Sequence, residues 1–380
     1  MVRLYRPPLR VWVWIAASVA LVVVATLLWR GSDAAATEST TAEPAGVPVG
    51  APAGTVSQAW SAVSEPMPGD VVDDGRVVVA SEHGVRAVDP LTGDEAWHYT
   101  RSNARLCDVA VTNGVAVAVF RTEDRCDEAV ALDSGTGVRT WTRNLNFRAD
   151  VRLESTDSIV LAVTRSGLVT LDPNNDNIRW RYEPPERCRI LDAQAGASGI
   201  ALLQRCSGSP AVQLRLLDGF AGDARWSRDL PDVTDDEVRL LGADRLVGVV
   251  VRDEIQLLSG ADGAPLGSLP SAGDALMTSA GVAALLRVDG ILHALDPATG
   301  DERWAVPALG LPTAPLTEKR GTAEGVVVVP EAAGFVFRDV VTGEPVGDPA
   351  AVEGLAEGGA ATALGPVLVH QLTDRVVAYR

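Results

Sequence analysis

Residues 294–304 read ALDPATGDERW, and this stretch decides the fold because variants of it recur along the chain. In each copy an apolar run leads into an Asp, which is replaced by Ser in the copy 257–267. A tight polar turn follows and, in most copies, a Trp. Successive marked Trp residues lie 39 to 46 residues apart, and the wider gap before Trp304 holds two units. A period near 40 with four short strands per unit is typical of a β-propeller blade. The copies with Trp are 87–97, 131–141, 170–180, 217–226 and 294–304, and those without it are 257–267 and 337–347.

The strand pattern within one copy supports a four-stranded blade. Residues 85–89 (VRAVD) follow a β-rich run and a short turn, and 95–99 (EAWHY) follow the Thr-Gly turn. The last copy ends with the chain and lacks an outer strand, whereas Thr55–Trp60 (TVSQAW) is a strand-like segment without a blade. We expect Thr55–Trp60 to complete the last blade. The sequence thus predicts an all-β, eight-bladed β-propeller over residues 56–380, closed by pairing of its two ends.

The repeat resembles a known family. ALDPATGDERW, with GVAALLRVDGILHA (281–294) leading into it, is similar to the pyrroloquinoline-quinone-type propeller repeat. That repeat occurs in quinoprotein dehydrogenases and in the propeller lipoprotein of the bacterial barrel-assembly machinery. The resemblance covers about residues 56–380, implies the propeller fold, and is nearest in style to the non-enzymatic envelope propellers of the lipoprotein type. Because one fold hosts many functions, the repeat does not by itself imply quinone binding.

The N-terminal region contains a candidate membrane span. Residues 11–29 (VWVWIAASVALVVVATLLW) are uncharged and would span about 28 Å as a helix, close to the thickness of a bilayer core. Residues 1–10 carry three Arg, whereas only Arg30 directly follows the span. The positive-inside rule then places 1–10 in the cytoplasm and the propeller outside. We therefore expect a single-pass protein of the cell membrane.

A cleaved signal peptide is the competing interpretation of this region. Ala34–Ala36 fit an A-x-A cleavage site, although the apolar stretch is longer than most signal peptides have. In both interpretations the bulk of the chain is exported. Residues 30–55 are rich in Ala, Pro and Thr and nearly free of bulky apolar side chains, so we expect a flexible linker.

The composition excludes several classes of protein. With 47% hydrophobic residues the chain is not disordered, and its 36 Gly follow no collagen period. The formal net charge is −17, which argues against nucleic acid as a partner.

The four cysteines form two pairs by spacing. Cys107 and Cys126 are 19 residues apart, and Cys188 and Cys206 are 18 apart, so each pair brackets the first two strands of one blade. In a hairpin the start of one strand lies near the end of the next, and the protein is exported, so we predict disulfides Cys107–Cys126 and Cys188–Cys206. A zinc site needs closer spacing. We expect both disulfides on the face opposite the Thr-Gly turns.

The recurring polar and aromatic residues are expected to be structural. A Trp that returns in every blade is an anchor for packing between blades, and an Asp that opens each turn accepts backbone N–H groups. The Trp set is Trp97, Trp141, Trp180, Trp226 and Trp304, and the Asp set is Asp89, Asp133, Asp172, Asp218 and Asp296.

Three further candidates have weak signals. From Asp172 to Glu183 the oxygen-bearing residues follow the spacing of a calcium loop, but Asn177 replaces the required Gly, and an ordinary turn is the preferred interpretation. The acidic run 234–237 reads as a solvated loop, with a basic partner or a cation as the alternative. No two histidines are close in sequence, so neither a metal cluster nor a catalytic relay follows from His83, His98, His293 and His370.

These observations favour a non-enzymatic, membrane-tethered scaffold that binds another envelope protein or a cell-wall polymer. We predict no catalytic, cofactor-binding or metal-binding residues. The alternatives are a small-ligand propeller that binds pyrroloquinoline quinone with calcium, as a quinoprotein oxidoreductase does, and a glycan-binding or sensor module. The quinoprotein resemblance would imply a disulfide between adjacent cysteines, calcium ligands and a catalytic Asp, and the chain has no adjacent cysteine pair. With four Tyr and five Phe, sugar stacking is disfavoured.

Overall fold

A long apolar helix precedes the propeller. The computed structural model describes residues 8–69, 71–147, 150–270, 273–313 and 325–380. Helix α1 (Leu9–Arg30) is exposed along its length and is long and apolar enough to cross a membrane. Only Gly31 and Ser32 separate it from the short helix α2 (Asp33–Ala36), whose first turn is capped by the Ser32 hydroxyl. The predicted cytoplasmic segment 1–10 lies mostly outside the described residues.

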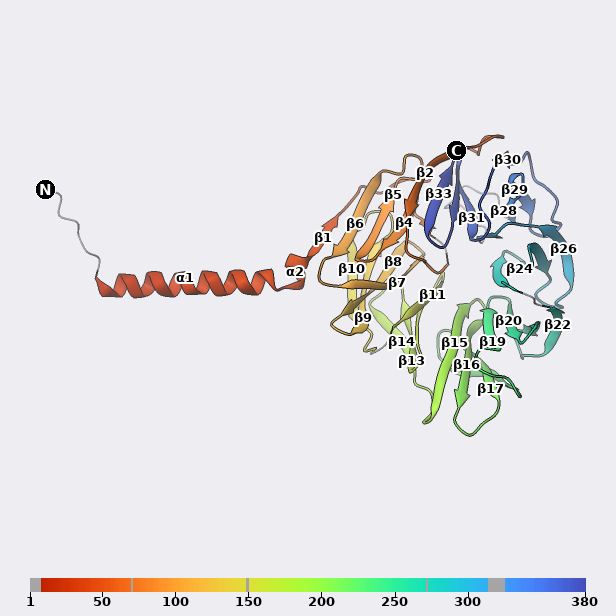
Figure 1. Cartoon of the computed structure of the whole chain (residues 1–380), viewed down its shortest axis with the longest axis horizontal. Coiled ribbons are helices and arrows are strands. Elements are labelled where there is room, and N and C mark those ends of the chain that lie inside the picture. The colour runs from red at the N-terminus through yellow and green to blue at the C-terminus, as the bar shows by residue number, and fades with distance from the viewer. Residues whose placement is uncertain (1–7, 70, 148–149, 271–272, 314–324) are drawn as a thin grey trace.

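Eight sheets form a ring of blades, as the repeat predicts (Figure 1). Each regular blade is an antiparallel meander whose first strand is innermost. The first four blades are β3–β6 (Val72–Asp73, Arg76–Ser81, Gly84–Val88, Glu95–Arg101), β7–β10 (Arg105–Thr112, Val115–Thr122, Arg125–Asp133, Arg139–Asn144), β11–β14 (Arg152–Thr156, Ile159–Thr164, Gly167–Asp172, Asn177–Tyr182) and β15–β18 (Cys188–Gly196, Gly199–Cys206, Val212–Leu217, Ala224–Leu230).

The second half of the ring is less regular. Blade seven has three strands among the described residues, and residues 314–324 before it lie outside them. The short strand β27 (Leu311–Pro312) pairs in parallel with the first strand of blade eight. Blades five to eight are β19–β22 (Val238–Gly242, Leu246–Val251, Glu254–Ser259, Pro265–Pro270), β23–β26 (Leu276–Ala280, Ala283–Val288, Ile291–Leu295, Glu302–Pro307), β28–β30 (Val326–Glu331, Gly334–Asp339, Ala350–Ala351) and β31–β33 (Ala360–Leu364, Val367–Gln371, Arg375–Tyr379) with β2 (Gln58–Val63).

The ring closes through strand β2, which is the outer strand of blade eight. It pairs antiparallel with β33 near the C-terminus (Figure 1). The predicted closure is confirmed, but its bounds are shifted, because the strand runs from Gln58 to Val63 rather than from Thr55 to Trp60. Thr55 instead forms a parallel bridge with Ala351 of blade seven. The N-terminal side of the chain therefore ties the last two blades together.

The prediction of a flexible linker over 30–55 is wrong. Residues 33–56, here called the strap, lie along the propeller. Strand β1 (Thr37–Thr40) pairs with β6 as a fifth strand of blade one, with Thr37 opposite Arg101. Beyond β1, the Ala42 N–H donates to Thr136 O, and the Val56 N–H donates to Ala351 O. The composition of the strap cannot form a core, but hydrogen bonds between parts of its backbone and the propeller hold it at these points.

A buried arginine fixes the start of the strap. The Arg101 side chain on β6 is 1% exposed, and its Nη2 lies 2.8 Å from the Asp33 carboxylate. Its Nη1 donates to Glu128 of blade two at 2.5 Å. Asn103 donates a second hydrogen bond to Asp33. Arg101 therefore joins the strap to blades one and two, although the Asp33 side chain itself is 71% exposed.

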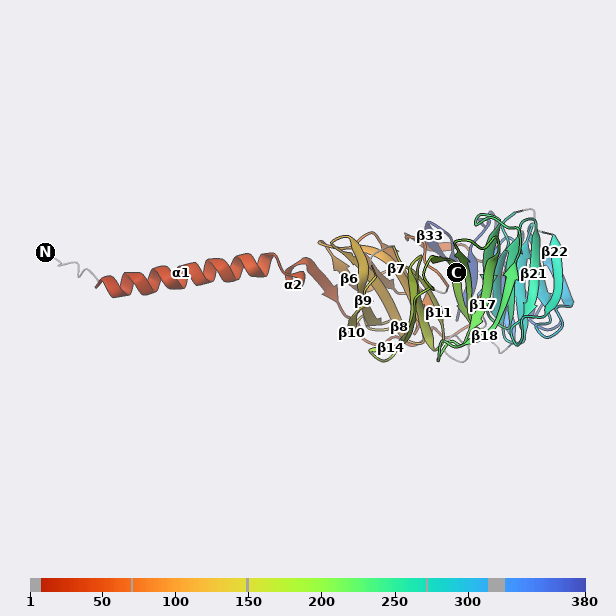
Figure 2. The same cartoon turned by 90° about the horizontal axis from the view of Figure 1, so that it is seen from below.

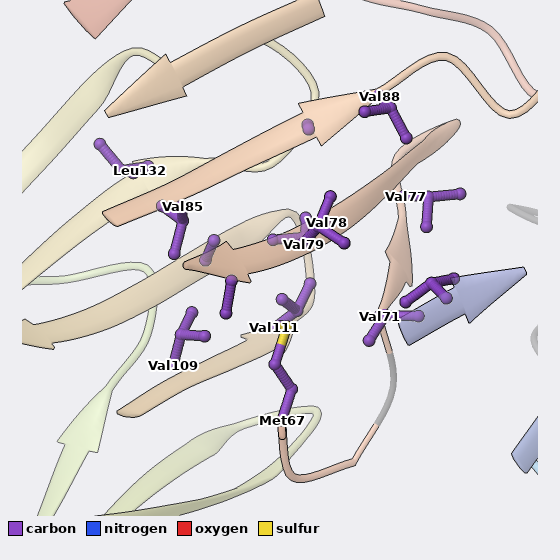
Figure 3. Close-up of a cluster of buried hydrophobic side chains, with 14 of the residues drawn as sticks. Met67, Val71, Val77, Val78, Val79, Val85, Val88, Val109, Val111 and Leu132 are labelled. Atoms are coloured by element: carbon purple, nitrogen blue, oxygen red, sulfur yellow. The ribbon is translucent and has the colours of Figure 1, made fainter. Parts of the chain in front are cut away.

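The core consists of apolar layers between neighbouring blades. Figure 3 shows one of them, where Val77 and Val79 of β4 and Val85 of β5 lie near Val109 and Val111 of β7. The second strands are buried on both faces, which is why they read as continuous Val, Ala and Leu runs rather than as alternating patterns.

Each recurring tryptophan connects its own blade to the next, as predicted, and blades five and seven lack this Trp. The indole N–H of each donates to a carbonyl in the turn before the outer strand of the following blade, and the ring packs against that turn. Gly137 shows how close the packing is: its φ is +75°, and an added Cβ would lie 2.6 Å from Trp97 Cγ. Trp60 of β2 belongs to the same set. The donor–acceptor pairs are Trp60–Pro90, Trp97–Ser134, Trp141–Pro173, Trp180–Gly219, Trp226–Gly260 and Trp304–Val340.

Candidate functional site

The propeller has two faces of different construction. We call turn face the side with the tight turns that join first to second and third to fourth strands. We call loop face the side with the connections between blades and the turns that join second to third strands. Figure 2 shows the disc from the side, with α1 extending from the blade-one edge roughly within the plane of the disc.

Both predicted disulfides are present in the structure. Cys107 is bonded to Cys126 in blade two, and Cys188 to Cys206 in blade four. Both lie at the loop face, opposite the Thr-Gly turns: Cys188–Cys206 joins the first two strands of blade four, and Cys107–Cys126 joins the first strand of blade two to the start of the third. Each closes a loop of about 20 residues, which in the chain-entropy model stabilises the fold by about 3 kcal/mol. The two disulfides therefore cross-link the strands of blades two and four.

The recurring aspartates are turn residues, as predicted. Asp89 Oδ1 accepts hydrogen bonds from the backbone N–H groups of Leu91 and Thr92. Asp133, Asp218 and Asp296 accept equivalent bonds from their own turns. An Arg on the next strand pairs with the same carboxylate in three blades. These pairs are Arg179–Asp172, Arg225–Asp218 and Arg303–Asp296.

The weaker candidates also have structural partners. Asp172 accepts the N–H groups of Asn174 and Asn175, which makes the calcium-like segment an ordinary turn. In the acidic run, Asp235 pairs with Arg189 and Arg205. No group of three or more His, Cys, Asp or Glu in the described ranges is arranged to hold a metal ion.

The four histidines lie apart from one another. His83 Nδ1 contacts Ala104 O, and His98 and His293 contact glutamates of their own blades. His370 is completely buried in blade eight, and burial lowers its pKa despite a contact with Gly358 O. His370 is therefore a neutral core residue.

A charged hollow of about 700 Å³ opens on the loop face where blades one to three meet. Its wall contains Arg105, Arg121, Arg152 and Asp108, together with the Cys107 end of a disulfide. Behind it, on the inner strands, Arg152 pairs with Asp192 at 2.5 Å and with Glu154 at 3.7 Å.

Asp108 in the wall of the hollow and Glu154 behind it have raised pKa values. Burial raises the pKa of Asp108 to about 6, against the opposing hydrogen bonds from the backbone of Leu153 and Val109. Burial also raises the pKa of Glu154 to about 7, although Arg152 opposes the shift. The residue pattern gave no signal for this cluster, because Asp108 and Asp192 face inward only through local register shifts in β7 and β15.

A raised pKa in a hollow is a property of general bases, but the hydrogen bonds indicate a structural role. Asp108 Oδ2 accepts the Leu153 N–H of the following blade at 2.7 Å. Asp192 Oδ2 accepts the Leu240 N–H of its following blade at 3.0 Å. These inner carboxylates thus connect blade two to three and blade four to five, as the tryptophans do further out.

Glu154→Gln is expected to stabilise the protein at alkaline pH. Because the pKa of Glu154 is raised from 4.5 to about 7 on folding, its favourable contribution is complete below pH 4.5 and is lost as the pH rises to 7. The amide should raise the free energy of unfolding by up to about 3 kcal/mol at pH 8 and by little at pH 4. Denaturant unfolding between pH 4 and pH 8 measures this. The exposed control Glu186→Gln should shift stability by less than about 0.5 kcal/mol, and an unchanged pH profile for Glu154→Gln would contradict the assignment.

The second hollow, of about 610 Å³, lies at the centre of the turn face. We call it the mouth. It is lined from blades all around the ring, by small residues and by apolar ones that include Ile159, Phe220 and Met277. Asp157 and Asp244 bring negative charge to its wall, and Arg225, the arginine of its lining, pairs with Asp218 at 2.7 Å.

A comparison with protein families assigns the repeat. The family described as "Outer membrane protein assembly factor BamB" matches residues 27–215 and 125–346 of this chain. The chain belongs to this family. It therefore carries the pyrroloquinoline-quinone-like propeller repeat that its sequence resembles, and none of the curated proteins matches it.

Solved structures with the same architecture include three informative ones. BamB from Moraxella catarrhalis is 17% identical, with 86% of this chain and 98% of that chain covered and a TM-score of 0.45. The computationally designed protein Ika8 is 14% identical, with 86% and 98% covered and a TM-score of 0.54. Quinohemoprotein alcohol dehydrogenase from Comamonas testosteroni is 12% identical, with 85% and 76% covered and a TM-score of 0.48. At these identities the likeness concerns the fold, for which Ika8 is the strongest support of the three.

The described residues do not fit pyrroloquinoline quinone. The cofactor is a polycarboxylate, so its site needs cationic side chains that are not already neutralised. At the mouth, the lining arginine is paired and the wall carries Asp157 and Asp244. In the loop-face hollow, Arg121 pairs with Asp150 and Arg152 with Asp192. Neither disulfide joins adjacent cysteines, because the bonded cysteines are 19 and 18 residues apart in sequence.

Proposed function

We propose that this protein is a non-enzymatic scaffold, anchored in the cell membrane by α1, whose propeller binds another protein of the bacterial envelope. The observation that carries the proposal is the family match over 27–346 to an assembly factor. A second support is the use of polar side chains: the turn aspartates and the inner carboxylates Asp108 and Asp192 hold blades together. Such a ring offers a rigid surface for binding a partner rather than an active site.

The placement outside the cytoplasm belongs to the same proposal. Two disulfides favour an oxidising compartment, and the arginines before α1 favour an inside location for the N-terminus. The strap then continues directly from the membrane into blade one.

Two measurements on the full-length protein test this function. In thermal melts, pyrroloquinoline quinone with calcium should leave the melting temperature unchanged, whereas a ligand at 100 times its Kd adds about 2.7 kcal/mol. In cells, photo-crosslinking residues at Val282 on the turn face and at Glu123 on the loop face should give a discrete larger species from at least one of them. A saturable melting shift with the quinone, or no crosslink from either face, would contradict the scaffold function.

A further inference from the structure

The turn face carries a ring of negative charge. The seven turns before the outer strands, from 89–94 in blade one to 339–344 in blade seven, contain twelve carboxylates and no Lys or Arg. Within the described residues, arginines from strands pair with five of them. The paired carboxylates are Asp89, Asp172, Asp176, Asp218 and Asp296. The other seven carboxylates form no ion pair among the described residues, so these turns are acidic.

The loop face is different, because its charges are mixed. Carboxylates such as Glu123, Asp124 and Asp253 form no ion pair among the described residues, whereas other acidic side chains on this face pair with arginines. These pairs include Arg105–Glu82, Arg121–Asp150, Arg189–Asp235 and Arg252–Glu237. Both faces therefore contribute to the net charge of −17, and the turn face differs in that the seven turns before its outer strands contain no basic residue.

At the centre of the acidic ring, the mouth offers apolar surface. Phe220 is 56% exposed, and the Arg179 guanidinium lies 4.8 Å from its ring centroid. Val282 and Val341, on turns of blades six and seven, are also about half exposed. The strap crosses the turns of blades one, two and eight, and no residue of 33–56 is among the described lining of the mouth. The sector from blade three to blade six is left open.

We propose that the turn face binds a basic, extended segment of a protein partner, with an apolar side chain inserted into the mouth beside Phe220. Lys or Arg residues of the segment would lie over Asp157 and Asp244. The mouth volume of about 610 Å³ is within the range of ligand pockets, and an aromatic residue in a central pocket is a typical site of strong binding. The surrounding carboxylates attract a cationic segment from a distance. An anionic lipid surface would be repelled by the same ring.

This inference rests on the scaffold function and names the surface that performs it. The probe is a short fluorescent peptide in which arginine and leucine alternate, separated by glycine, and its counterpart has glutamate in place of every arginine. Full-length protein in detergent should bind the arginine peptide with an affinity that falls as salt rises. The glutamate peptide should not bind.

Matched variants distinguish binding at the mouth from non-specific electrostatic attraction to the protein. Asp157→Asn with Asp244→Asn removes two carboxylates from the mouth, and Glu123→Gln with Asp124→Asn removes two from a loop-face turn. We expect the mouth pair and Phe220→Ala each to weaken binding about tenfold, and the loop-face pair to weaken it less than twofold. Circular dichroism and melting temperature confirm that each variant is folded.

Two results would overturn the inference. Equal weakening by the two carboxylate pairs would show attraction to net charge alone, and full binding by Phe220→Ala would show that the mouth is not used. If either occurs while crosslinks form from Glu123, the scaffold function stands and its surface is the loop face. If crosslinks fail from both faces, the scaffold function itself fails.

Discussion

Arg101→Met is expected to lower the free energy of unfolding by about 1 to 3 kcal/mol. The Arg101 side chain is 1% exposed and pairs with Asp33 of the strap and Glu128 of blade two, whose side chains are 71% and 25% exposed, so its removal takes away two charge-assisted contacts without leaving a fully buried charge. The guanidinium carbon of Arg101 also lies 5.8 Å from the centroid of the Phe120 ring, so the substitution removes a cation–π contact as well. Denaturant unfolding measures the loss, and hydrogen exchange of the β1 amides, 37–40, should accelerate because the strap is released.

Arg105→Met is the matched control for this experiment. Arg105 also forms an ion pair, with Glu82 at 2.8 Å, but the two side chains are 66% and 56% exposed. Exposed pairs contribute between 0 and about 1 kcal/mol. A loss for Arg101→Met no greater than that for Arg105→Met, with unchanged exchange over 37–40, would show that the strap is not held by this arginine.

Trp97→Ala is expected to lower the free energy of unfolding by about 3 to 5 kcal/mol. Trp97 is completely buried, packs against the Gly137 turn of blade two, and donates its indole N–H to Ser134 O. The substitution therefore removes a large apolar contact between blades and leaves a carbonyl unpaired. Denaturant unfolding followed by far-ultraviolet circular dichroism, which does not depend on the lost indole, measures the change.

The repeat provides its own control for Trp97. Trp226 occupies the same position in blade four and makes the same kind of hydrogen bond, at 3.3 Å, but it is only partly buried. Trp226→Ala should therefore cost clearly less than Trp97→Ala. Equal costs would mean that burial does not determine the contribution of the anchor, and a negligible cost at both positions would contradict the role of these residues in joining blades.

The architecture was predictable because the same residue types recur at equivalent positions of several blades. Trp, Asp and Gly return once per blade, and their spacing gives the period, the turns and the disulfide hairpins. The bounds of β2 were less accessible, because Thr55 and Trp60 both contact other blades and only the pairing with β33 shows where the strand begins.

The strap and the inner carboxylates were not predictable by the same reasoning. Residues 30–55 lack bulky apolar side chains, and their order comes from backbone hydrogen bonds to β6 and from the ion pair between the exposed Asp33 and the buried Arg101. Both depend on surfaces that exist only after the ring has folded. Glu154 and Asp108 are single residues on inner strands, and neither belongs to the repeating pattern that identified the other sites.

The strap changes how far the propeller can travel from its anchor. A free linker over 30–55 would have a root-mean-square length of about 28 Å, and the propeller would explore a wide volume above the bilayer. With the strap bound, only Gly31 and Ser32 remain between α1 and the folded body, and two extended residues reach at most about 7 Å. A partner fixed in the same membrane then meets the propeller at a high effective concentration if its binding segment lies at that height. A partner whose segment lies further out is not reached at all, so the strap selects partners by height above the bilayer.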